Sequence, residues 1–484
     1  MADFVSLDGK LVKDQVLQDG IEDIEGEMHT NHILGLYADF DESTFTRLFA
    51  AKGLTAGSDF DAFGMYGQRK LCNVADDGTI TAWYGDENYT ETGYTTDPQT
   101  QQTIQVQVMV RQPKFWYKVV PVELEEITSD DPTQTGVHGY SGVRMKYYIA
   151  DRPIPGFKVH PAFYNAQGQE VDCYYIGAYE ACLYDVSEAE YRAYDTWDVT
   201  EDGGVYTINA LNTYLANANN DKLCSIAGVK PASGEYSTQF TRPNVNKMAK
   251  NRGDGWGSLN VKIAAAEQLL FVIEFASFNS QACIGGGVVD YANTANSHNV
   301  SAFTGSTASI GNGTGMAEST VRLTSSGTVN TGTTGGKVSV RYRGVENFYG
   351  NIYAYMSGVN VWGNGTMMGG EPYICDDFAY AESKSTDNYK PAGFVSPYST
   401  GSDPITRFGY SEGYDWLFIP SELGGSTALP VGDTLYTSNQ LNEYRITLLG
   451  GFWAADTRSG DFLWNMGAVV DRRSNTIGAR LVKV

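Results

Sequence analysis

The side chains that most often carry chemistry are few and scattered in this chain of 484 residues. No CxxC pair and no Cys/His spacing of a metal site occurs, so we expect free, buried thiols and no metal centre built on these residues. The cysteines are Cys72, Cys173, Cys182, Cys224, Cys283 and Cys375. The histidines are His29, His32, His138, His160 and His298.

Acidic residues offer weaker signals. The pairs Asp376/Asp377 and Glu125/Glu126 have the type needed for glycoside hydrolysis. Asp376 and Asp377 together with Asp290 have the type needed to bind calcium. The chain has 57 acidic residues, so chance proximity is the default explanation, and no calcium site is assigned. GNGTG at 311–315 lacks the Lys and Ser/Thr of a phosphate loop and is expected to be an ordinary loop.

The last segment, Leu448 to Val484, carries a different pattern. Trp453 and Trp464 stand among glycines, and short runs of small or polar residues lie between and after them. Rigid aromatics separated by exchangeable loop positions favour a recognition surface over a reaction centre. We therefore look for function here first.

Composition excludes several classes of partner. A net charge of -23 argues against nucleic acid and anionic membranes, both of which need a basic face. The longest strongly apolar run, LLFVI at 269–273, is too short for membrane insertion. Asp3 and Asp8 occupy the place of a basic signal region, so we expect cytoplasmic synthesis and release by another route, such as cell lysis. The 32 tyrosines suit both half-buried strands and exposed binding faces.

Three regions are expected along the chain. Residues 1–55 would form an attachment or oligomerisation segment, with a short amphipathic helix and a strand within 12–40 and a further helix over 42–53. Residues 56–144 would be a β-rich domain with a hairpin at the DG turn near 77–78 and a strand break at Pro113. Residues 145–484 would form a mixed domain containing a strand in CYYIGAYEACLY and two helices, one after Thr241 and one apolar nearly all round at 260–281. Residues 285–337, rich in Gly, Ser and Thr, are predicted to be a surface insertion.

Several short motifs occur in the order found in one known group. They are GWG at 255–257, SVRYRGVENFYGNIYAYMSGVNVWGN at 339–364, DWLFIPSELGGS at 415–426 and the terminal GGFW, WN and IGARL. Together they resemble phage tail or receptor-binding proteins with a C-type-lectin-like domain of the formylglycine-generating-enzyme type, a group that includes the variable proteins of diversity-generating retroelements. The resemblance covers roughly residues 60–484. It implies an α+β fold: a β-rich N-terminal region, then a C-type-lectin-like domain with two helices, short strands and long loops.

Enzymes share the fold that this resemblance implies. Formylglycine-generating enzymes use a cysteine pair near the C-terminal end, and no cysteine follows Cys375 here. Related sulfoxide synthases use an HxxxHxE pattern, and the spacing of His29 and His32 does not fit it. We therefore expect no catalytic residues, no cofactor and no metal, although a site assembled in space stays open.

The resemblance also divides the terminal segment into scaffold and variable positions. The scaffold would be Gly450, Gly451, Trp453, Gly460, Phe462, Trp464, Asn465, Ile477, Gly478, Ala479, Arg480 and Leu481. The ligand-binding positions would be Phe452, Ala454, Ala455, Asp456, Thr457, Asp461, Leu463, Ala468, Val469, Val470, Asp471 and Arg472. Every residue type in the second set can arise from an Asn codon by change at adenines, whereas Trp and Met cannot. Core packing is the competing explanation for Phe452, Leu463 and the two valines.

The resulting hypothesis is a virion-displayed tail or fibre protein that binds a host surface protein or glycan. Other virion structural proteins would be its partners, and a homotrimer is expected by analogy. Two alternatives remain open: an enzyme of the formylglycine-generating or sulfoxide-synthase type, and a purely structural tail or head-fibre component.

Overall fold

Strands dominate the architecture. The computed structural model describes residues 4–7, 10–13, 30–97, 100–129, 132–192, 197–202, 205–211, 216–234, 239–289, 301–320, 322–323, 329–330, 338–364, 369–375, 389–399, 401–437 and 441–484. Strand accounts for 39% and helix for 14%, and the described residues contain four α-helices. The predicted α+β class with a C-type-lectin-like domain is therefore wrong, and the fold is β-rich. The reason is that Tyr-, Val- and Ile-rich segments of the second half pair over long sequence distances as strands.

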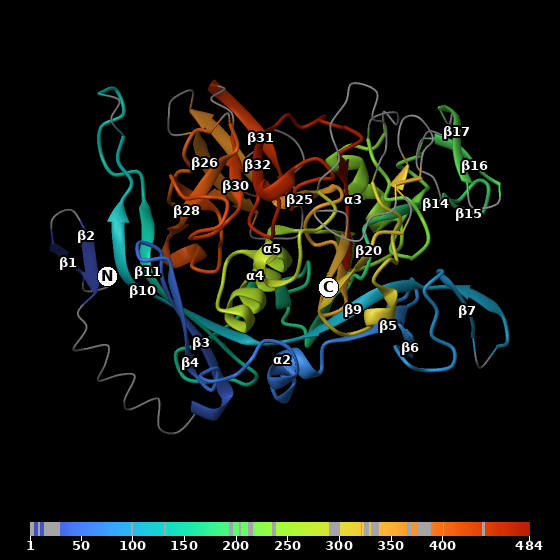
Figure 1. Cartoon of the computed structure of the whole chain (residues 1–484), viewed down its shortest axis with the longest axis horizontal. Helices are drawn as coiled ribbons and strands as arrows, with labels where there is room; N and C mark the ends of the chain where they lie inside the picture. Colours follow the sequence, from blue (N-terminus) through green and yellow to red (C-terminus); the bar gives the residue numbers. More distant parts are fainter. Residues whose placement is uncertain are drawn as a thin grey trace.

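The largest sheet joins the N-terminal and C-terminal regions of the chain (Figure 1). Its main path, in spatial order, is β1 (Phe4–Leu7), β2 (Lys10–Lys13), β10 (Trp116–Glu126), β11 (Tyr140–Ala150), β28 (Asp403–Tyr410), β30 (Thr434–Tyr436), β32 (Trp464–Ala468), β31 (Leu441–Leu449), β25 (Tyr353–Asn364), β26 (Gly370–Cys375) and β27 (Tyr389–Pro391). Strands β3 (Ile33–Asp39), β4 (Thr44–Phe49), β12 (Lys158–Val159), β29 (Pro420–Leu423) and β33 (Ile477–Gly478) pair beside this path. β30–β32 and β25–β33 are parallel, and the other pairs are antiparallel.

A second, antiparallel sheet contains the last strand of the chain, β34, between two other strands. In spatial order it contains β19 (Trp256–Ser258), β34 (Leu481–Lys483), β13 (Cys173–Gly177), β9 (Gln107–Pro113), β5 (Lys70–Val74) and β6 (Ile80–Trp83). The IGARL segment is thus divided between the two sheets, because β33 pairs with β25 and β34 pairs with β13 and β19.

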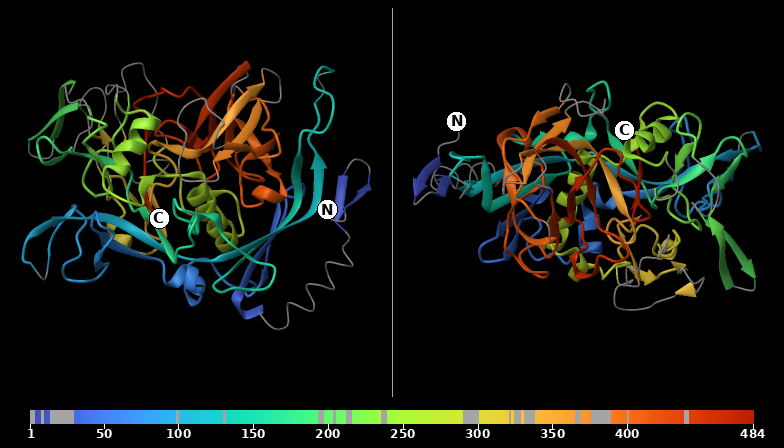
Figure 2. Two further views of the ribbon diagram at one scale, coloured as in Figure 1. Left: turned by 180° about the vertical axis from the view of Figure 1, so that it is seen from behind. Right: turned by 90° about the horizontal axis from the view of Figure 1, so that it is seen from above.

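Smaller sheets and short helices complete the described chain. The sheets are β14 (Cys182–Asp185) with β15 (Glu190–Arg192) and β18 (Lys222–Cys224), β16 (Trp197–Asp202) with β17 (Val205–Leu211), β20 (Gly315–Glu318) with β23 (Val338–Tyr342) and β24 (Val345–Glu346), β21 (Arg322–Leu323) with β22 (Val329–Asn330), and β7 (Tyr94–Thr96) with β8 (Thr103–Gln105). The α-helices are α2 (Gly64–Gly67), α3 (Arg242–Lys250), α4 (Val261–Phe275) and α5 (Ser280–Cys283). The 3-10 helices are η1 (Thr30–His32), η2 (Ser58–Ala62), η3 (Pro161–Phe163), η4 (Ala308–Ile310), η5 (Glu412–Tyr414) and η6 (Asp456–Arg458). The β1–β2 and β16–β17 hairpins lie at opposite ends of the molecule (Figure 2).

Several local predictions are confirmed, and two are wrong. The β5–β6 hairpin forms at the DG turn, where Gly78 has φ +92°, and the strand breaks after Pro113. Helix α3 forms directly after Thr241, as the capping pattern predicts. Helix α4 begins after its N-cap Asn260, as predicted, but it ends at Phe275 and not at 281. CYYIGAYEACLY forms two strands, β13 and β14, rather than one. The helix expected over 42–53 is instead β4, whose Thr and Phe residues pair along β3.

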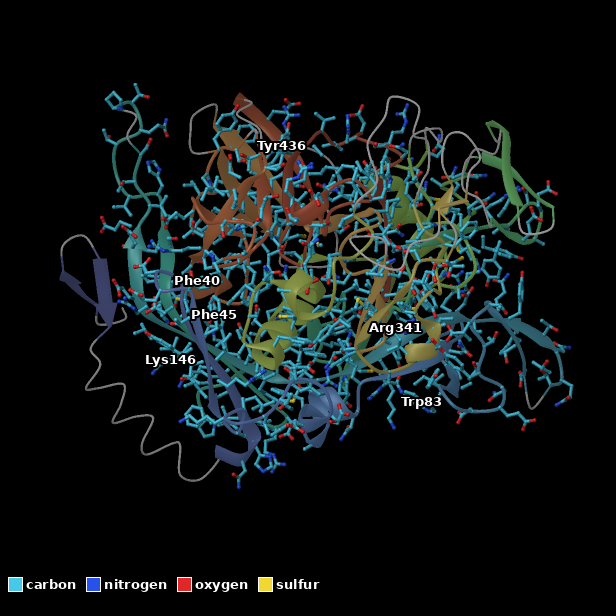
Figure 3. The ribbon with its side chains drawn as sticks, in the orientation of Figure 1. Phe40, Phe45, Trp83, Lys146, Arg341 and Tyr436 are labelled. Carbon is cyan, nitrogen blue, oxygen red and sulfur yellow. The ribbon has the colours of Figure 1, made fainter. Side chains whose placement is uncertain are left out.

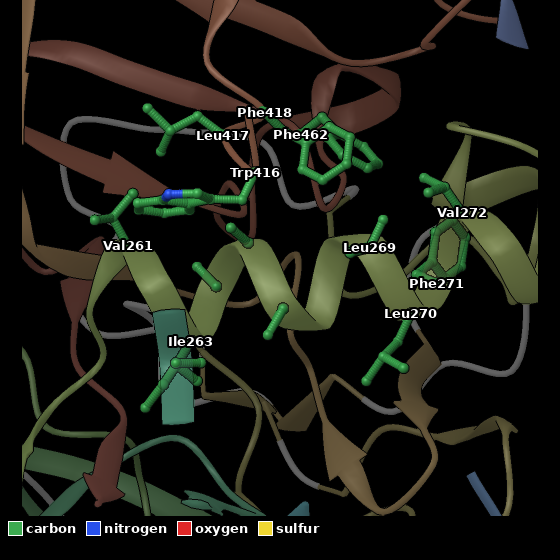
Figure 4. Close-up of a cluster of buried hydrophobic side chains, with 14 of the residues drawn as sticks. Val261, Ile263, Leu269, Leu270, Phe271, Val272, Trp416, Leu417, Phe418 and Phe462 are labelled. Atoms are coloured by element: carbon green, nitrogen blue, oxygen red, sulfur yellow. The ribbon is translucent and has the colours of Figure 1, made fainter. Parts of the chain in front are cut away.

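Helix α4 lies at the centre of the largest apolar core. Fourteen of its fifteen residues are buried. Trp416, Phe418 and Phe462 cover one side of the helix, and Ile263 and Leu270 point to the opposite side (Figure 4). The core also contains residues from β3, β9, β10, β11 and β25, so every one of the three expected regions contributes to it.

Two buried carboxylates on α4 are each held by an arginine. Arg69 donates two hydrogen bonds to Glu267, at 2.8 and 2.7 Å. Arg343 donates two to Glu274, at 2.6 and 2.7 Å. Tyr342 also donates to Glu274, at 2.9 Å. A buried charge without a partner is very unfavourable, so these bidentate pairs fix where α4 lies against its neighbours.

The Arg69–Glu267 pair gives a prediction about stability. Replacing Arg69 by Met leaves Glu267 buried and unpaired, and the free energy of unfolding should fall by about 3–5 kcal/mol. Replacing both Arg69 and Glu267 by Met should recover a large part of that lost free energy, because no unpaired charge is then left buried. Urea unfolding measures both. The control is Lys114→Met, which breaks exposed ion pairs to Glu170 and Asp172 and should change stability by about 1 kcal/mol or less. Equal losses for Arg69→Met and the control would contradict the assignment.

Candidate functional site

The two tryptophans of the terminal segment belong to its scaffold. Trp453 is 0% exposed and Trp464 is 1% exposed. The Trp464 indole donates to the carbonyl of Phe418 at 3.0 Å, and the backbone N–H of Trp453 donates to the carbonyl of Asn351 at 3.0 Å. Neither ring can present a contact surface to a ligand.

Glycines allow the loop between β31 and β32 to fold tightly onto itself. Gly451 has φ +86°, and a Cβ there would lie 1.9 Å from the Ser459 hydroxyl oxygen. A Cβ at Gly460 would lie 2.0 Å from a carboxylate oxygen of Asp433. Ser459 donates to the carbonyl of Gly450 at 2.9 Å and closes the loop. Any larger residue at these glycines would open it.

The structure places the twelve predicted ligand-binding residues at three depths. Five are exposed: Asp456, Thr457, Val469, Asp471 and Arg472. Three are half-buried: Phe452, Ala454 and Val470. Four are buried: Ala455, Asp461, Leu463 and Ala468. The buried four offer little surface to a macromolecular ligand, so most of the exposed surface of this set belongs to the other eight.

A hollow of about 320 Å³ opens beside the end of β32, and we call it the terminal hollow. Its lining residues are Tyr353, Tyr436, Leu448, Asn465, Gly467, Ala468, Val469, Arg472, Thr476 and Ile477. Three of them, Ala468, Val469 and Arg472, belong to the predicted set. Phe452 is joined to the hollow through Tyr353, since the two rings stack with centroids 5.4 Å apart.

Tyr436 forms an aromatic wall of the terminal hollow and was missed by sequence reasoning. It ends β30 and lies opposite Asn465 of the parallel strand β32. The side chain is 37% exposed and lies at the outer edge of the C-terminal strands (Figure 3). A Cβ at Gly467 would fall 2.6 Å from its ring, so that glycine leaves room for the tyrosine. The local sequence around Tyr436 carries no signal that would single it out from the other tyrosines.

Asp456 and Thr457 form a separate exposed patch on η6. The Asp456 N–H donates to the carbonyl of Val289 at 2.8 Å, and its carbonyl accepts from the Gln281 amide at 3.1 Å. Neither residue lines the terminal hollow. Underneath, Trp453 packs with Val288 and Ala302. The described part of 285–337 therefore contributes to the core below η6, contrary to the purely surface course predicted for it.

Buried acids hold this region from below. Asp461 donates its N–H to the Ser280 hydroxyl at 3.1 Å, and its carbonyl accepts from the Gln268 amide at 2.6 Å. Burial, with a smaller contribution from the charge of Glu267, raises the pKa of Asp461 to about 8. Burial also raises the pKa of the neighbouring Asp433 well above its usual value. Burial therefore favours the neutral form of both carboxyls.

Glu180 is a third buried acid and anchors the chain before β25. The Asn351 amide donates to Glu180 at 2.6 Å, and the Asn351 side-chain oxygen accepts from the N–H of Ala302 at 2.6 Å. Burial raises the pKa of Glu180 to about 8, although the charge of Arg480 and the hydrogen bond from Asn351 oppose the shift. Asn351 thereby joins three parts of the chain: Glu180 between β13 and β14, the 301–303 segment, and Trp453.

Groups considered for metal or catalytic chemistry do not assemble in the described residues. Among them, no three His, Cys, Asp or Glu side chains gather as a metal site needs. His160 is fully buried, its ring nitrogen accepts from the N–H of Ala162, and burial lowers its pKa to about 3. Glu125 pairs with Arg407. GNGTG forms a loop in which Asn312 accepts from the N–H of Leu71. Asp290, Asp376, Asp377, His29 and His298 lie outside the described residues.

Another hollow, of about 600 Å³, lies beside β19, and none of its lining residues belongs to the predicted set. Its lining includes Lys250, Asp254, Trp256 and Asn260. Trp256 is 3% exposed, and its indole donates to the carbonyl of Asp76 at 2.8 Å, so this aromatic is occupied in packing. No helix in the described part of the chain is long and apolar enough to cross a membrane.

Comparison with known proteins gives weak structural likenesses. No protein-family model and no curated protein sequence matches the chain. The solved structures of the Major Tropism Determinant P3c Variant and U1 Variant are similar to it at 13% sequence identity, over 91% of this chain and 77% of theirs. The TM-scores are 0.22 and 0.23. Values this low do not establish a shared fold.

The buried acids predict a dependence of stability on pH. Asp461 and Glu180 have pKa values of about 8 when folded, above the unfolded values of about 3.9 and 4.3. Their stabilisation is therefore complete below pH 4 and is lost as pH rises towards 8, by up to about 1.4 kcal/mol per pH unit for each group. Asp461→Asn mimics the protonated acid. Its midpoint of thermal unfolding should fall less than that of the wild type between pH 5 and pH 8.5.

The exposed Asp471→Asn is the matched control and should follow the wild-type profile. Parallel profiles for Asp461→Asn and the wild type would show that Asp461 is ionised in the folded protein.

Proposed function

We propose that this protein is displayed on a phage virion, as part of a tail or fibre, and binds a protein or glycan on the surface of a bacterial host. The terminal hollow with its exposed rim is the binding site. The observation that carries the proposal is the convergence of the predicted segment, an exposed tyrosine and a concave surface at one place. Ligand sites are typically concave, with aromatic and apolar walls and a few polar groups.

The chemistry of the terminal hollow supports recognition. Tyr436 and Val469 are two of the large apolar residues with substantial exposure in the described chain, at 37% and 36%, and both line this hollow. Exposed aromatic area of this kind is enriched at the centres of binding interfaces. Asn465 and Thr476 supply polar groups beside it.

Charge also distinguishes the terminal hollow. Arg472 is the one charged residue among its described lining residues, in a protein whose net charge is -23. An exposed guanidinium favours a carboxylate, a phosphate or a polar carbonyl on the ligand. The lining contains no carboxylate, imidazole or thiol in the described chain, so it lacks the acid–base pair or nucleophile that a reaction would need. We accordingly propose a non-catalytic binding role.

A single hollow of this size would bind modestly, and display in several copies on a virion would raise the overall affinity by avidity. We propose a homo-oligomer, with a trimer as the first state to test, held on the particle by other virion structural proteins. The β1–β2 hairpin lies at one end of the long axis of the molecule (Figure 2), and we propose it as the attachment region.

We further propose that the terminal segment is diversified by a retroelement, within limits set by the backbone. Asp456 has φ +54°, a conformation that Asp, Asn and Gly tolerate far better than branched residues. Val469 and Arg472 carry no such constraint in the described structure. A template copy of the terminal coding segment that differs at adenines, next to a reverse transcriptase gene, is the expected finding in the flanking DNA. Adenine differences that also fall in the codons of Gly451, Gly460 or Gly467 would contradict the scaffold assignment.

Binding to whole cells tests the role of the terminal hollow. Labelled protein is applied to a panel of intact bacterial strains, and Tyr436→Ala and Arg472→Glu are then compared with the wild type on a strain that binds. Each variant should lose about tenfold or more in affinity, because each removes a central contact without touching the core.

Matched controls come from the same chain. Tyr84, 40% exposed, is replaced by Ala, and Arg152, half exposed in its pair with Asp151, is replaced by Glu. Both controls should bind as the wild type does. Wild-type binding by Tyr436→Ala and Arg472→Glu would overturn the site, and binding to none of a broad panel of strains would overturn the function.

A further inference from the structure

Cys182 and Cys224 lie directly opposite each other in the small sheet formed by β15, β14 and β18. They are a register pair of the antiparallel strands β14 and β18, and both are 0% exposed. Opposed residues in antiparallel strands have Cα atoms about 4.5–5.5 Å apart. A disulfide needs about 4.4–6.8 Å between Cα atoms, so the backbone already provides the required spacing.

The two thiols contact each other and differ in character. Directly opposed residues of antiparallel strands place their side chains on the same face of the sheet, so the two thiols are neighbours. The Cys224 thiol donates to the carbonyl of Lys222 at 3.2 Å. Arg252 donates to the Cys224 sulfur at 2.8 Å and is held in place by Asp76. Burial raises the pKa of Cys182 well above its usual value. For Cys224 burial acts in the same direction, but the Cys182 hydrogen bond and the charge of Arg252 outweigh it and lower the pKa.

We propose that Cys182 and Cys224 form a site of oxidative modification, at which a peroxide converts the thiol pair into a cross-strand disulfide. Cys224 is the nucleophile, Cys182 the resolving thiol and Arg252 a positioning residue. The proposal does not depend on what the terminal hollow binds.

The reaction balances with hydrogen peroxide as the oxidant. The Cys224 thiolate attacks one peroxide oxygen, the O–O bond breaks, and the released hydroxide takes up a proton to become water. The Cys182 sulfur then attacks the sulfenic sulfur of Cys224. The S–O bond breaks, and the hydroxyl leaves as water with the Cys182 proton. Overall, two thiols and one hydrogen peroxide give one disulfide and two waters.

The position of the pair gives the cross-link a structural consequence. Strands β15, β16 and β17 lie in the chain between Cys182 and Cys224, so the bond would close this excursion at its base. The residues that flank the pair are held by hydrogen bonds to the rest of the protein. The N–H of Ala181 donates to the carbonyl of Ala479, and Ser225 donates to the Gln107 side chain and to the carbonyl of Val108. The disulfide would therefore join two well-anchored points and restrict the unfolded chain more than the folded one.

Mass spectrometry of the full-length protein tests the proposal. Reduced protein is treated with hydrogen peroxide, alkylated under denaturing conditions and digested. The wild type should yield one linked peptide pair containing Cys182 and Cys224, a mass lower by two hydrogen atoms, and a higher midpoint of thermal unfolding. Cys182→Ser should leave a sulfenic acid on Cys224 that a dimedone probe traps, whereas Cys224→Ser should give no adduct at Cys182.

Cys72→Ser is the matched control, because Cys72 is equally buried and burial raises its pKa to about 12. It should form the same linked peptide and show the same thermal shift as the wild type. Arg252→Lys keeps a cation but loses the planar contact, so the pH at which the oxidation rate is half-maximal should rise. Free thiols at both positions after peroxide treatment of the wild type, or linkage that involves the other cysteines equally, would overturn the proposal.

Discussion

Glu267 and Glu274 lie two turns apart on α4, where burial would make either charge highly unfavourable without its arginine. Arg69 and Arg343 satisfy them from outside the helix, and the Arg69 side chain also donates to the carbonyl of Arg343 at 3.0 Å. Arg343 reaches further, to Asp61 and the carbonyl of Gly57. The two pairs therefore form one network that joins the 57–69 segment, α4 and the turn after β23. Apolar packing alone would allow α4 to rotate or slide, whereas this directional network does not.

The terminal segment depends on the same helix. Gln268, the residue after Glu267, bonds to the backbone carbonyl of Asp461, and Ser280 just beyond α4 bonds to its N–H. Trp464 is tied to the Phe418 carbonyl, and Phe418 packs near the Trp416 side of α4 (Figure 4). The loop is thus held mainly by backbone hydrogen bonds and buried rings. Exposed side chains at 469 and 472 can then change without altering the bonds that hold the loop.

Local patterns were readable from sequence, and long-range pairing was not. The β5–β6 hairpin, the break at Pro113 and helix α4 follow from turn residues, proline chemistry and apolar periodicity, all of which act within a few residues. The segment over 42–53 has no such decisive signal, and it forms strand β4 because it pairs with β3. The α+β prediction is wrong for a related reason, because pairs such as β25–β31 and β28–β30 join segments distant in sequence. Burial of Asp461 was equally hidden, since acidic residues in loops are normally solvated.

The aromatic wall of the terminal hollow shows how such a site can remain constant while its chemistry changes. Tyr436 reaches the hollow only because β30 pairs in parallel with β32, and its ring fits because position 467 has no side chain. Neither condition involves Val469 or Arg472. Tyr436 and Gly467, which shape the aromatic wall, are therefore different from Arg472, which gives the hollow its charge. A surface divided in this way can acquire a new ligand by substitution at its rim, because the shape and the fold beneath it are specified elsewhere.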